Sequence, residues 1–303
     1  MHIGLNGGAA SADRMIEQAQ KAEADGFHAL WYPSAVAGDP LVAMAMAGRA
    51  TERIELGTAV LQTYTSHPFL QANRVVATAE AMGRDGLVLG IGPSHAPVIE
   101  GVLGMDYSHA GRHTEEYVHM LTALLRGEAV DVAGDDLTLR GGLKVPSTGR
   151  TVPVLVSALA PRLLRVAGAV ADGTILWMGN ARAVDQHVVP RITKAAADAG
   201  RPAPRIVAGL PVAVCDDEAE GREAAAKQFA MYGTLPNYQR ILELGSAAGP
   251  ADAAIVGDEA SVSAQLQGLL DAGATDIWAA IFPVGDDAGA SRRRTRALLK
   301  ELL

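Results

Sequence analysis

The sequence predicts a (β/α)8 TIM barrel of the α/β class, and three observations support this fold class. The chain has 303 residues, of which 49% are hydrophobic and 20% charged, so it can bury one large core. Short apolar runs alternate with longer Ala-rich amphipathic segments, as strands and helices do in α/β proteins. A passage from helix to glycine turn to apolar strand recurs at 22–33, 81–92, 169–179 and 271–282.

Each predicted strand is an apolar run bounded by Gly, Pro or polar residues. These runs lie at 2–6, 28–33, 54–60, 86–91, 153–157, 174–178, 205–214 and 276–282. Helical spacing of apolar residues predicts helices near 12–25, 39–51, 69–82, 112–126, 160–170, 182–199, 217–230 and 259–271. Strands and helices in equal number favour the barrel over an open doubly wound sheet, which needs fewer strands.

Two segments do not fit the repeat. Residues 127–150 alternate apolar and polar side chains around Gly-Asp-Asp, which predicts a β-hairpin inserted after the fourth strand. Residues 231–258 interrupt the chain after the seventh strand, where long insertions in barrels form lids or substrate walls. No linker or charge block divides the chain, so we expect residues 1–303 to form a single domain.

Composition narrows the location and the partners. The net charge of −8 argues against general nucleic-acid binding, and Cys215 is the only cysteine, which excludes a disulfide framework. Neither a secretory signal nor an apolar run of membrane length is visible. The basic cluster at 291–296 is interpreted as a solvated helix face or a subunit contact. We therefore expect a cytoplasmic protein, a homodimer that binds neither nucleic acid nor membrane.

The stretch 53–97 indicates where the chemistry lies. Its two apolar strands flank one Ala-rich helix, so they form a βαβ unit and should be parallel neighbours. Polar residues follow both strands, and function in such folds gathers at the carboxyl ends of the strands. An imidazole can exchange a proton near neutral pH, which makes His67 and His95 candidate acid–base residues. For His67, a capping or loop-bracing hydrogen bond explains the residue equally well.

Several familiar motifs are absent from the sequence. The run GIGPSH lacks a third glycine and has Pro93 where a phosphate-binding helix should begin, and there is no GxxxxGK[ST] motif. Ser94 stands outside any GxSxG elbow. His109 and His113 lack the glutamate of an HExxH motif, so no metal site is predicted. Strand ends poor in charge suit a planar organic cofactor better than hydrolysis.

The chain resembles the luciferase-like monooxygenase superfamily along nearly its whole length. The resemblance rests on IGLNGG, GFHALWYPS, ERIELGTAVLQTYTSHP, LVLGIGPSHAPVIEGVLG, VPVLVSALAPRLLRVAGAVADGTILWMG and RIVAGLPVAVCDD. The third and fourth segments most resemble the actinobacterial subfamily that uses coenzyme F420, a 5-deazaflavin hydride carrier. The resemblance implies an F420-dependent oxidoreductase acting on a small organic substrate. The alternatives are an FMN-dependent monooxygenase and a non-catalytic flavin-binding partner subunit.

The resemblance also implies which residues hold the cofactor. A bulge at Thr58, Ala59 and Val60 would contain a non-proline cis peptide between Ala59 and Val60 that backs the central ring. Gly92, Ser94 and His95 would line the ring and the ribityl chain. Backbone amides of the helix that begins near Pro161 would face the phosphate. The segments implied to hold the phosphate and the ribityl chain consist of Ser157, Ala158, Leu159, Ala160, Trp177, Met178 and Gly179.

At two points the chain departs from its relatives. His95 stands where related sugar-phosphate dehydrogenases have an acidic proton donor. Many relatives have an acid–histidine pair after the second strand, which is absent here; Asp39 is a candidate for the missing acid. An N-cap for the helix starting at Pro40 explains Asp39 equally well. Cations that clamp a sugar phosphate are not evident in 231–285, which disfavours such a substrate.

Overall fold

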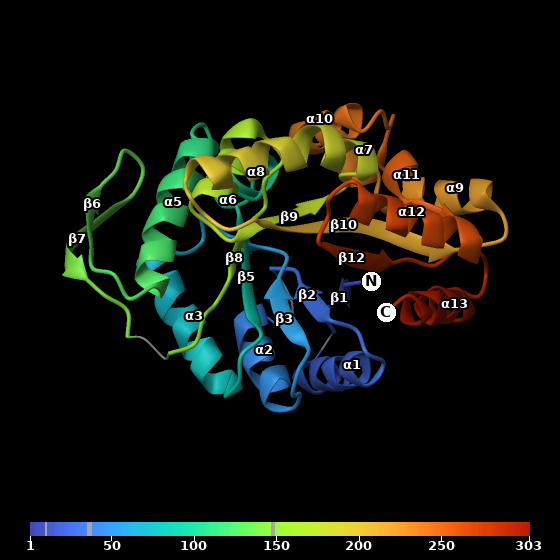
Figure 1. Ribbon diagram of the computed structural model, residues 1–303, viewed down its shortest axis with the longest axis horizontal. Helices are drawn as coiled ribbons and strands as arrows, with labels where there is room; N and C mark the ends of the chain where they lie inside the picture. The colour runs from blue at the N-terminus through green and yellow to red at the C-terminus, as the bar shows by residue number, and fades with distance from the viewer. Residues whose placement is uncertain (10, 35–37, 147–148) are drawn as a thin grey trace.

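The computed structural model describes residues 1–9, 11–34, 38–146 and 149–303, and it confirms the predicted (β/α)8 barrel (Figure 1). Its parallel strands close in the order β1-β2-β3-β5-β8-β9-β10-β12, with β12 paired to β1, which excludes the open sheet. The barrel strands are β1 (Ile3–Asn6), β2 (Ala29–Tyr32), β3 (Glu55–Thr58), β5 (Leu87–Gly92), β8 (Val154–Val156), β9 (Gly173–Trp177), β10 (Arg205–Val214) and β12 (Asp276–Ile281).

Helices surround the barrel and bury one face each against it. The long ones are α1 (Ala12–Ala24), α2 (Pro40–Arg49), α3 (Pro68–Met82), α5 (Ala110–Leu125), α6 (Pro161–Ala169), α8 (Val189–Asp198), α9 (Glu218–Gln228), α12 (Glu259–Asp271) and α13 (Ala288–Glu301). Local signals set their ends: Asp258 accepts a hydrogen bond from the Ser261 amide at the start of α12, and Gly83 ends α3 with a φ of 72°.

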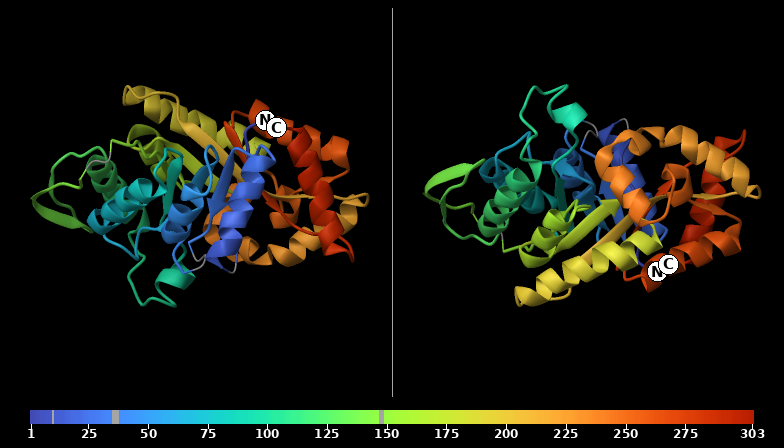
Figure 2. Two further views of the ribbon diagram at one scale, coloured as in Figure 1. Left: turned by 90° about the horizontal axis from the view of Figure 1, so that it is seen from below. Right: turned by 90° about the horizontal axis from the view of Figure 1, so that it is seen from above.

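The terminal helix α13 carries the basic cluster, in which Arg292 and Arg293 are exposed and two other arginines form ion pairs. Arg294 pairs with Asp216 and Glu259, and Arg296 pairs with Asp25, so these two arginines bind α13 to the rest of the chain instead of lying free in solvent. The amino group of Met1 also donates to the carbonyl of Leu302 at 2.7 Å. The two termini therefore lie side by side, as Figure 2 shows.

Two elements differ from the sequence prediction. The third strand stops at Thr58, and a short strand β4 (Leu61–Gln62) follows and pairs with β5. The peptide between them, Ala59–Val60, is cis, as the resemblance implied. The helix expected at 182–199 is divided into α7 (Ala181–Ala183), a π turn η1 (Val184–Val188) and α8. Pro190 has no amide hydrogen to donate to the preceding turn, which accounts for the irregularity.

The first insertion is the predicted hairpin, formed by antiparallel strands β6 (Val130–Ala133) and β7 (Thr138–Leu143). The hairpin stands beside α5, away from the barrel (Figures 1 and 2). Glu116 of α5 accepts hydrogen bonds from the backbone amides of residues 135–137, which holds the hairpin turn against the helix.

The second insertion is built from a 3-10 helix η2 (Ala230–Thr234), α10 (Pro236–Leu244), α11 (Pro250–Ala253) and a strand β11 (Ile255–Gly257) that pairs in parallel with the end of β10. The short β11 and a short helix α4 (Ala96–Ile99) after β5 were not predicted, since so few residues carry no periodic pattern. Over the described residues, no helix is both long and apolar enough to cross a membrane.

Candidate active site

A chamber of about 480 Å³ opens at the carboxyl ends of the barrel strands. Strand ends on different sides of the barrel and the segment 228–238 contribute to its walls. This is the end of a barrel at which ligands and catalytic groups gather. Of the residues that the sequence assigned to the site, those lining the chamber are Ala59, Val60, Ser94, His95, Ser157 and Trp177.

A narrower cavity of about 230 Å³ continues the chamber, because both are lined by Val60, Ser94, His95 and Ser157. We call it the arm. It extends to the start of α6, whose first turn has no side-chain cap. Uncapped amides at a helix N-terminus attract anions, and the guanidinium of Arg162 lies in the same lining, paired with Glu115 at 2.6 Å. Three further predicted residues line the arm: Gly92, Leu159 and Ala160.

Four of the predicted cofactor-binding residues lie outside the lining of both cavities. The hydroxyl of Thr58 is buried, donating to the Gly90 carbonyl at 2.7 Å and accepting from its amide at 2.9 Å. Ala158 and Met178 are fully buried, and Gly179 packs against Leu176. These four residues therefore belong to the packed interior around the two cavities.

His95 lies where the chamber and the arm meet. It is the first residue before α4, and its imidazole makes no capping hydrogen bond there. None of the described residues is hydrogen-bonded to the imidazole, whose ring centre lies 5.5 Å from that of Tyr238. Burial lowers the pKa of His95 below its ordinary value of 6.5. The ring is therefore neutral at neutral pH and can accept a proton.

The residue before His95 has an uncommon backbone. Ser94 has a φ of 64°, a left-handed conformation that non-glycine residues seldom adopt. Its carbonyl accepts a hydrogen bond of 2.6 Å from the hydroxyl of Tyr107. Burial and the neighbouring Tyr64 raise the pKa of Tyr107 to about 12, so the hydroxyl stays protonated and keeps donating. The sequence contained no motif that marked Tyr107.

The structure places His67 and Asp39 away from the chamber. Nδ1 of His67 accepts from the Phe69 amide at the start of α3, and Nε2 lies 3.2 Å from the carbonyl of Thr138 in the hairpin. Asp39 caps α2 through the Leu41 amide and pairs with Arg74. The loop-bracing and N-cap interpretations are thus the ones that the contacts support.

His67 shares a separate hollow of about 400 Å³ with His109 and His113. Across the part of the chain that the structure describes, no three His, Cys, Asp or Glu side chains are placed to hold a metal ion.

Aromatic residues that sequence reasoning missed form much of the chamber wall. Trp278 of β12 donates from Nε1 to Oδ1 of Asn6, the last residue of β1, at 3.0 Å. Asn6 could have been found, because it is a polar residue at a strand end like His95. Tyr232 and Tyr238 come from the second insertion, where no periodic pattern shows which side chains point inward.

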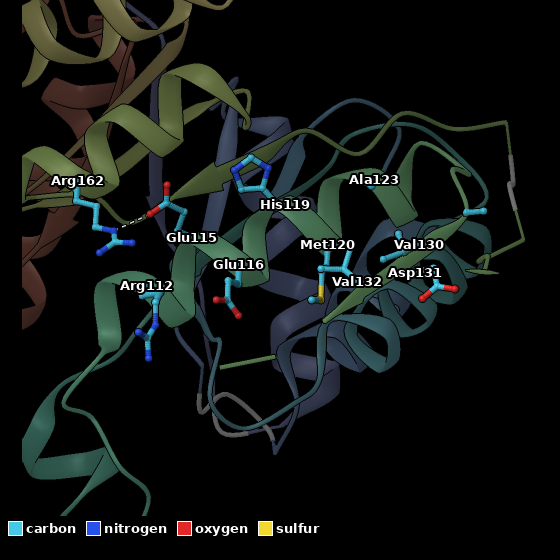
Figure 3. Close-up of a pocket in the computed structure, with 11 residues that line it drawn as sticks. Arg112, Glu115, Glu116, His119, Met120, Ala123, Val130, Asp131, Val132 and Arg162 are labelled. Atoms are coloured by element: carbon cyan, nitrogen blue, oxygen red, sulfur yellow. Dashed lines mark hydrogen bonds and ion pairs between the residues drawn. The ribbon is translucent and has the colours of Figure 1, made fainter. Parts of the chain in front are cut away.

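Another hollow, of about 600 Å³, lies outside the barrel between α5 and the hairpin (Figure 3). Its charged side chains are already paired: Arg162 with Glu115, and Arg112 with Asp136 at 2.7 Å. Glu116 holds the hairpin turn. The contacts of Arg112 and Glu116 fix the hairpin to α5, and the pair of Arg162 with Glu115 joins α6 to α5. All three contacts are structural.

Comparisons with known proteins identify the family of the chain. The model of the luciferase-like monooxygenase family matches residues 2–301. An uncharacterized protein of Mycobacterium tuberculosis is 26% identical over 304 residues, covering 96% of this chain and 89% of that protein. The 5,10-methylenetetrahydromethanopterin reductase of Methanolobus tindarius is 26% identical over 235 residues, covering 76% of this chain and 70% of the reductase.

Solved structures show the same fold with different cofactors. The coenzyme F420-dependent tetrahydromethanopterin reductase of Methanopyrus kandleri has a TM-score of 0.79 and 20% identity, covering 99% of this chain and 97% of that one. The oxygenating constituent of 3,6-diketocamphane monooxygenase from Pseudomonas putida was solved in complex with FMN. It has a TM-score of 0.73 and 16% identity, and the match covers 99% of this chain and 97% of that one. At such identities the likeness establishes the fold alone.

Proposed function

Because this chain belongs to the luciferase-like monooxygenase family, we propose that it is an F420-dependent oxidoreductase that transfers a hydride between C5 of the deazaflavin and a small organic substrate. One observation carries the proposal. The chamber beside His95 continues, through shared lining residues, into an arm that ends at an uncapped helix N-terminus and Arg162. A planar ring with an anionic side chain needs these two compartments in this order.

The lining residues fit a flat ring. A Cβ atom at Gly92 would lie 2.9 Å from Cβ of Ser157 and 3.1 Å from Cγ2 of Val60, so a side chain there would fill the junction between chamber and arm. Glycine leaves this junction open. Ala59, Val60 and Ser157 would contact the ring, and the amides of Ala160 and the first turn of α6, with Arg162, would hold the phosphate.

When bound, the deazaflavin supplies a carbon that takes up or gives a hydride and reacts poorly with oxygen. The chain supplies the proton chemistry through His95. When an alcohol is oxidised, the hydride leaves the substrate carbon with its electron pair, and the hydroxyl proton passes to the neutral imidazole. A carbonyl compound is the product, and in the reverse direction the protonated imidazole returns the proton to oxygen. Burial keeps His95 neutral, which suits the accepting role.

An FMN-dependent monooxygenase is the second candidate, since the Pseudomonas putida protein has this fold and binds FMN. F420 is favoured because residues 52–68 and 87–104 most resemble the subfamily that uses it. A non-catalytic partner subunit is disfavoured because neither Trp177 nor the second insertion fills the chamber.

Titration of the purified protein with F420 and with FMN tests the proposal, with quenching of tryptophan fluorescence as the signal, since Trp177 and Trp278 line the chamber. We expect F420 to bind with a dissociation constant in the micromolar range or below, and at least about tenfold tighter than FMN. Arg162→Ala should weaken F420 binding about tenfold, while Arg165→Ala on the same helix should not. Micromolar binding of FMN without any response to F420 would overturn the proposal.

A further inference from the structure

A continuous series of aromatic rings forms one wall of the chamber. The ring centres of Trp278 and Trp177 are 4.9 Å apart, and those of Trp177 and Tyr232 are 5.7 Å apart. Tyr232 and Tyr238 follow at 4.9 Å, and Tyr238 lies 5.5 Å from His95. The wall thus begins in the barrel, crosses the second insertion and ends at the imidazole that exchanges the proton.

The chamber contains no ionic group to receive a charged substrate. Among the described residues that line it, none is Asp, Glu, Lys or Arg, and the positions outside the described ranges are Ala, Val, Ser and Thr in sequence. Burial shifts the pKa of His95 down and those of Tyr232 and Tyr238 up, so all three are neutral at neutral pH. An ionised substrate would lose its hydration here and gain no counter-charge.

Trp177 contributes a polar atom to this wall. Trp177 is 8% exposed, and its Nε1–H is buried without a hydrogen-bond partner among the described residues. Aromatic surfaces around that donor favour a flat apolar body through offset and edge-to-face packing.

We propose that the substrate is an uncharged molecule with a ring-shaped apolar body and one hydroxyl or carbonyl oxygen. The oxygen lies at the His95 end and the body packs along Trp177, Tyr232, Tyr238 and Trp278. This inference rests on the proposed function for the reaction and on the chamber lining for the substrate class. Among the described residues that line the chamber or the arm, Arg162 is the one Lys or Arg, and it lies in the arm, which the proposed function assigns to the cofactor.

Three probes that share one ring test the substrate class: benzyl alcohol, the anionic 4-(hydroxymethyl)benzoate and the cationic 4-(hydroxymethyl)benzylamine. Their binding to the full chain, with and without saturating F420, is measured by tryptophan fluorescence and calorimetry. We expect benzyl alcohol to bind at least about tenfold tighter than either ionised probe. Equal or tighter binding of an ionised probe would overturn the proposal, as would no binding of benzyl alcohol at millimolar concentration to the F420-loaded protein.

Two sets of variants locate the binding. Tyr232→Ala removes a ring from the wall and should weaken benzyl alcohol binding about tenfold, whereas Tyr232→Phe should stay within about twofold. Ile281→Lys adds a cation to the lining and should shift the preference toward the benzoate probe; Leu70→Lys, on the exposed surface of α3, should not. If the two Tyr232 variants bind benzyl alcohol equally, the aromatic wall does not select the substrate.

The substrate class and the proposed function fail separately. A protein that binds FMN instead of F420 but still rejects both ionised probes would retain the substrate class and lose the cofactor assignment. A protein that binds F420 tightly but accepts ionised probes would retain the cofactor assignment and lose the substrate class.

Discussion

The two ends of the barrel have opposite chemistry. At the amino-terminal end, Arg205 donates to Asp276 at 2.5 Å and 3.0 Å and to Glu55 at 2.6 Å, and these residues are the first of β10, β12 and β3. At the carboxyl-terminal end the chamber has no ionic side chain among its described lining residues, and Nε1–H of Trp177 is buried without a partner among the described residues.

The pKa values of buried groups differ between the two ends in the same way. Burial alone would raise the pKa of Asp276, but the hydrogen bonds and charge of Arg205 hold it below its usual value. Burial alone would lower the pKa of Arg205, and the two carboxylates raise it. Near His95 no charge opposes burial, so its pKa falls. The amino-terminal end is thus held together by ion pairs, while the chamber at the other end offers no counter-charge.

The largest expected effect comes from His95→Ala at the carboxyl-terminal end. Turnover should fall by about 10²–10⁴-fold, the usual contribution of a positioned acid or base, and F420 affinity should stay within about tenfold. Single-turnover hydride transfer and the dissociation constant measure the two quantities. His119→Ala, on the exposed face of α5, is the matched control. If the variant turns over like the wild type, His95 is only a wall of the cavity.

At the opposite end, Arg205→Met should lower the free energy of unfolding by about 3–5 kcal/mol, because it leaves Glu55 and Asp276 without a buried counter-charge. Urea unfolding gives the value, and F420 affinity of the folded variant should not change. A loss below about 1 kcal/mol would show that the network adds little to stability.

Tyr107→Phe should have a smaller effect than either of these variants. It tests whether a structural hydrogen bond at the carboxyl-terminal end also supports catalysis. It removes the hydrogen bond to the Ser94 carbonyl, worth about 1 kcal/mol, and loosens the loop that positions His95. We expect hydride transfer to slow about tenfold with an unchanged pH profile. Tyr64→Phe, which keeps the ring that packs on Tyr107, should have no such effect. If Tyr107→Phe and Tyr64→Phe transfer hydride at equal rates, the hydroxyl of Tyr107 does not help to position His95.

The pH dependence gives the smallest effect. With a pKa below 6.5, His95 is neutral at neutral pH, so the rate of substrate oxidation should be constant there and fall as the pH drops through the lowered pKa. Stability follows the same sign: below 6.5 the unfolded state binds the proton more readily, so this group lowers stability as the pH falls. A rate that keeps rising above neutral pH would point to a different base.

Sequence periodicity predicted the barrel because alternating strands and helices repeat locally along the chain. It also predicted His95 at a strand end, since position along a strand determines which end of the barrel a residue occupies. The family resemblance implied Ser157 and Trp177, which line the chamber with His95. His67 and Asp39 show the limit of that argument, because helix-capping side chains occupy the same loops as catalytic ones.

The aromatic wall was beyond sequence reasoning for a related reason. Tyr232 and Tyr238 reach Trp177 only through the packing of the second insertion over the barrel, and an insertion without periodicity does not show which side chains face inward. The same holds for Tyr107, whose partner is a carbonyl of another loop.

A crystal structure of the protein with F420 tests the central claim most directly, namely that the carboxyl-terminal end of the barrel binds a deazaflavin. We expect the ring to contact Ala59 and Val60, with the substrate face toward His95 and the phosphate at the start of α6 near Arg162. F420 bound in the hollow between α5 and the hairpin (Figure 3), or a chamber that takes FMN and excludes F420, would contradict the account.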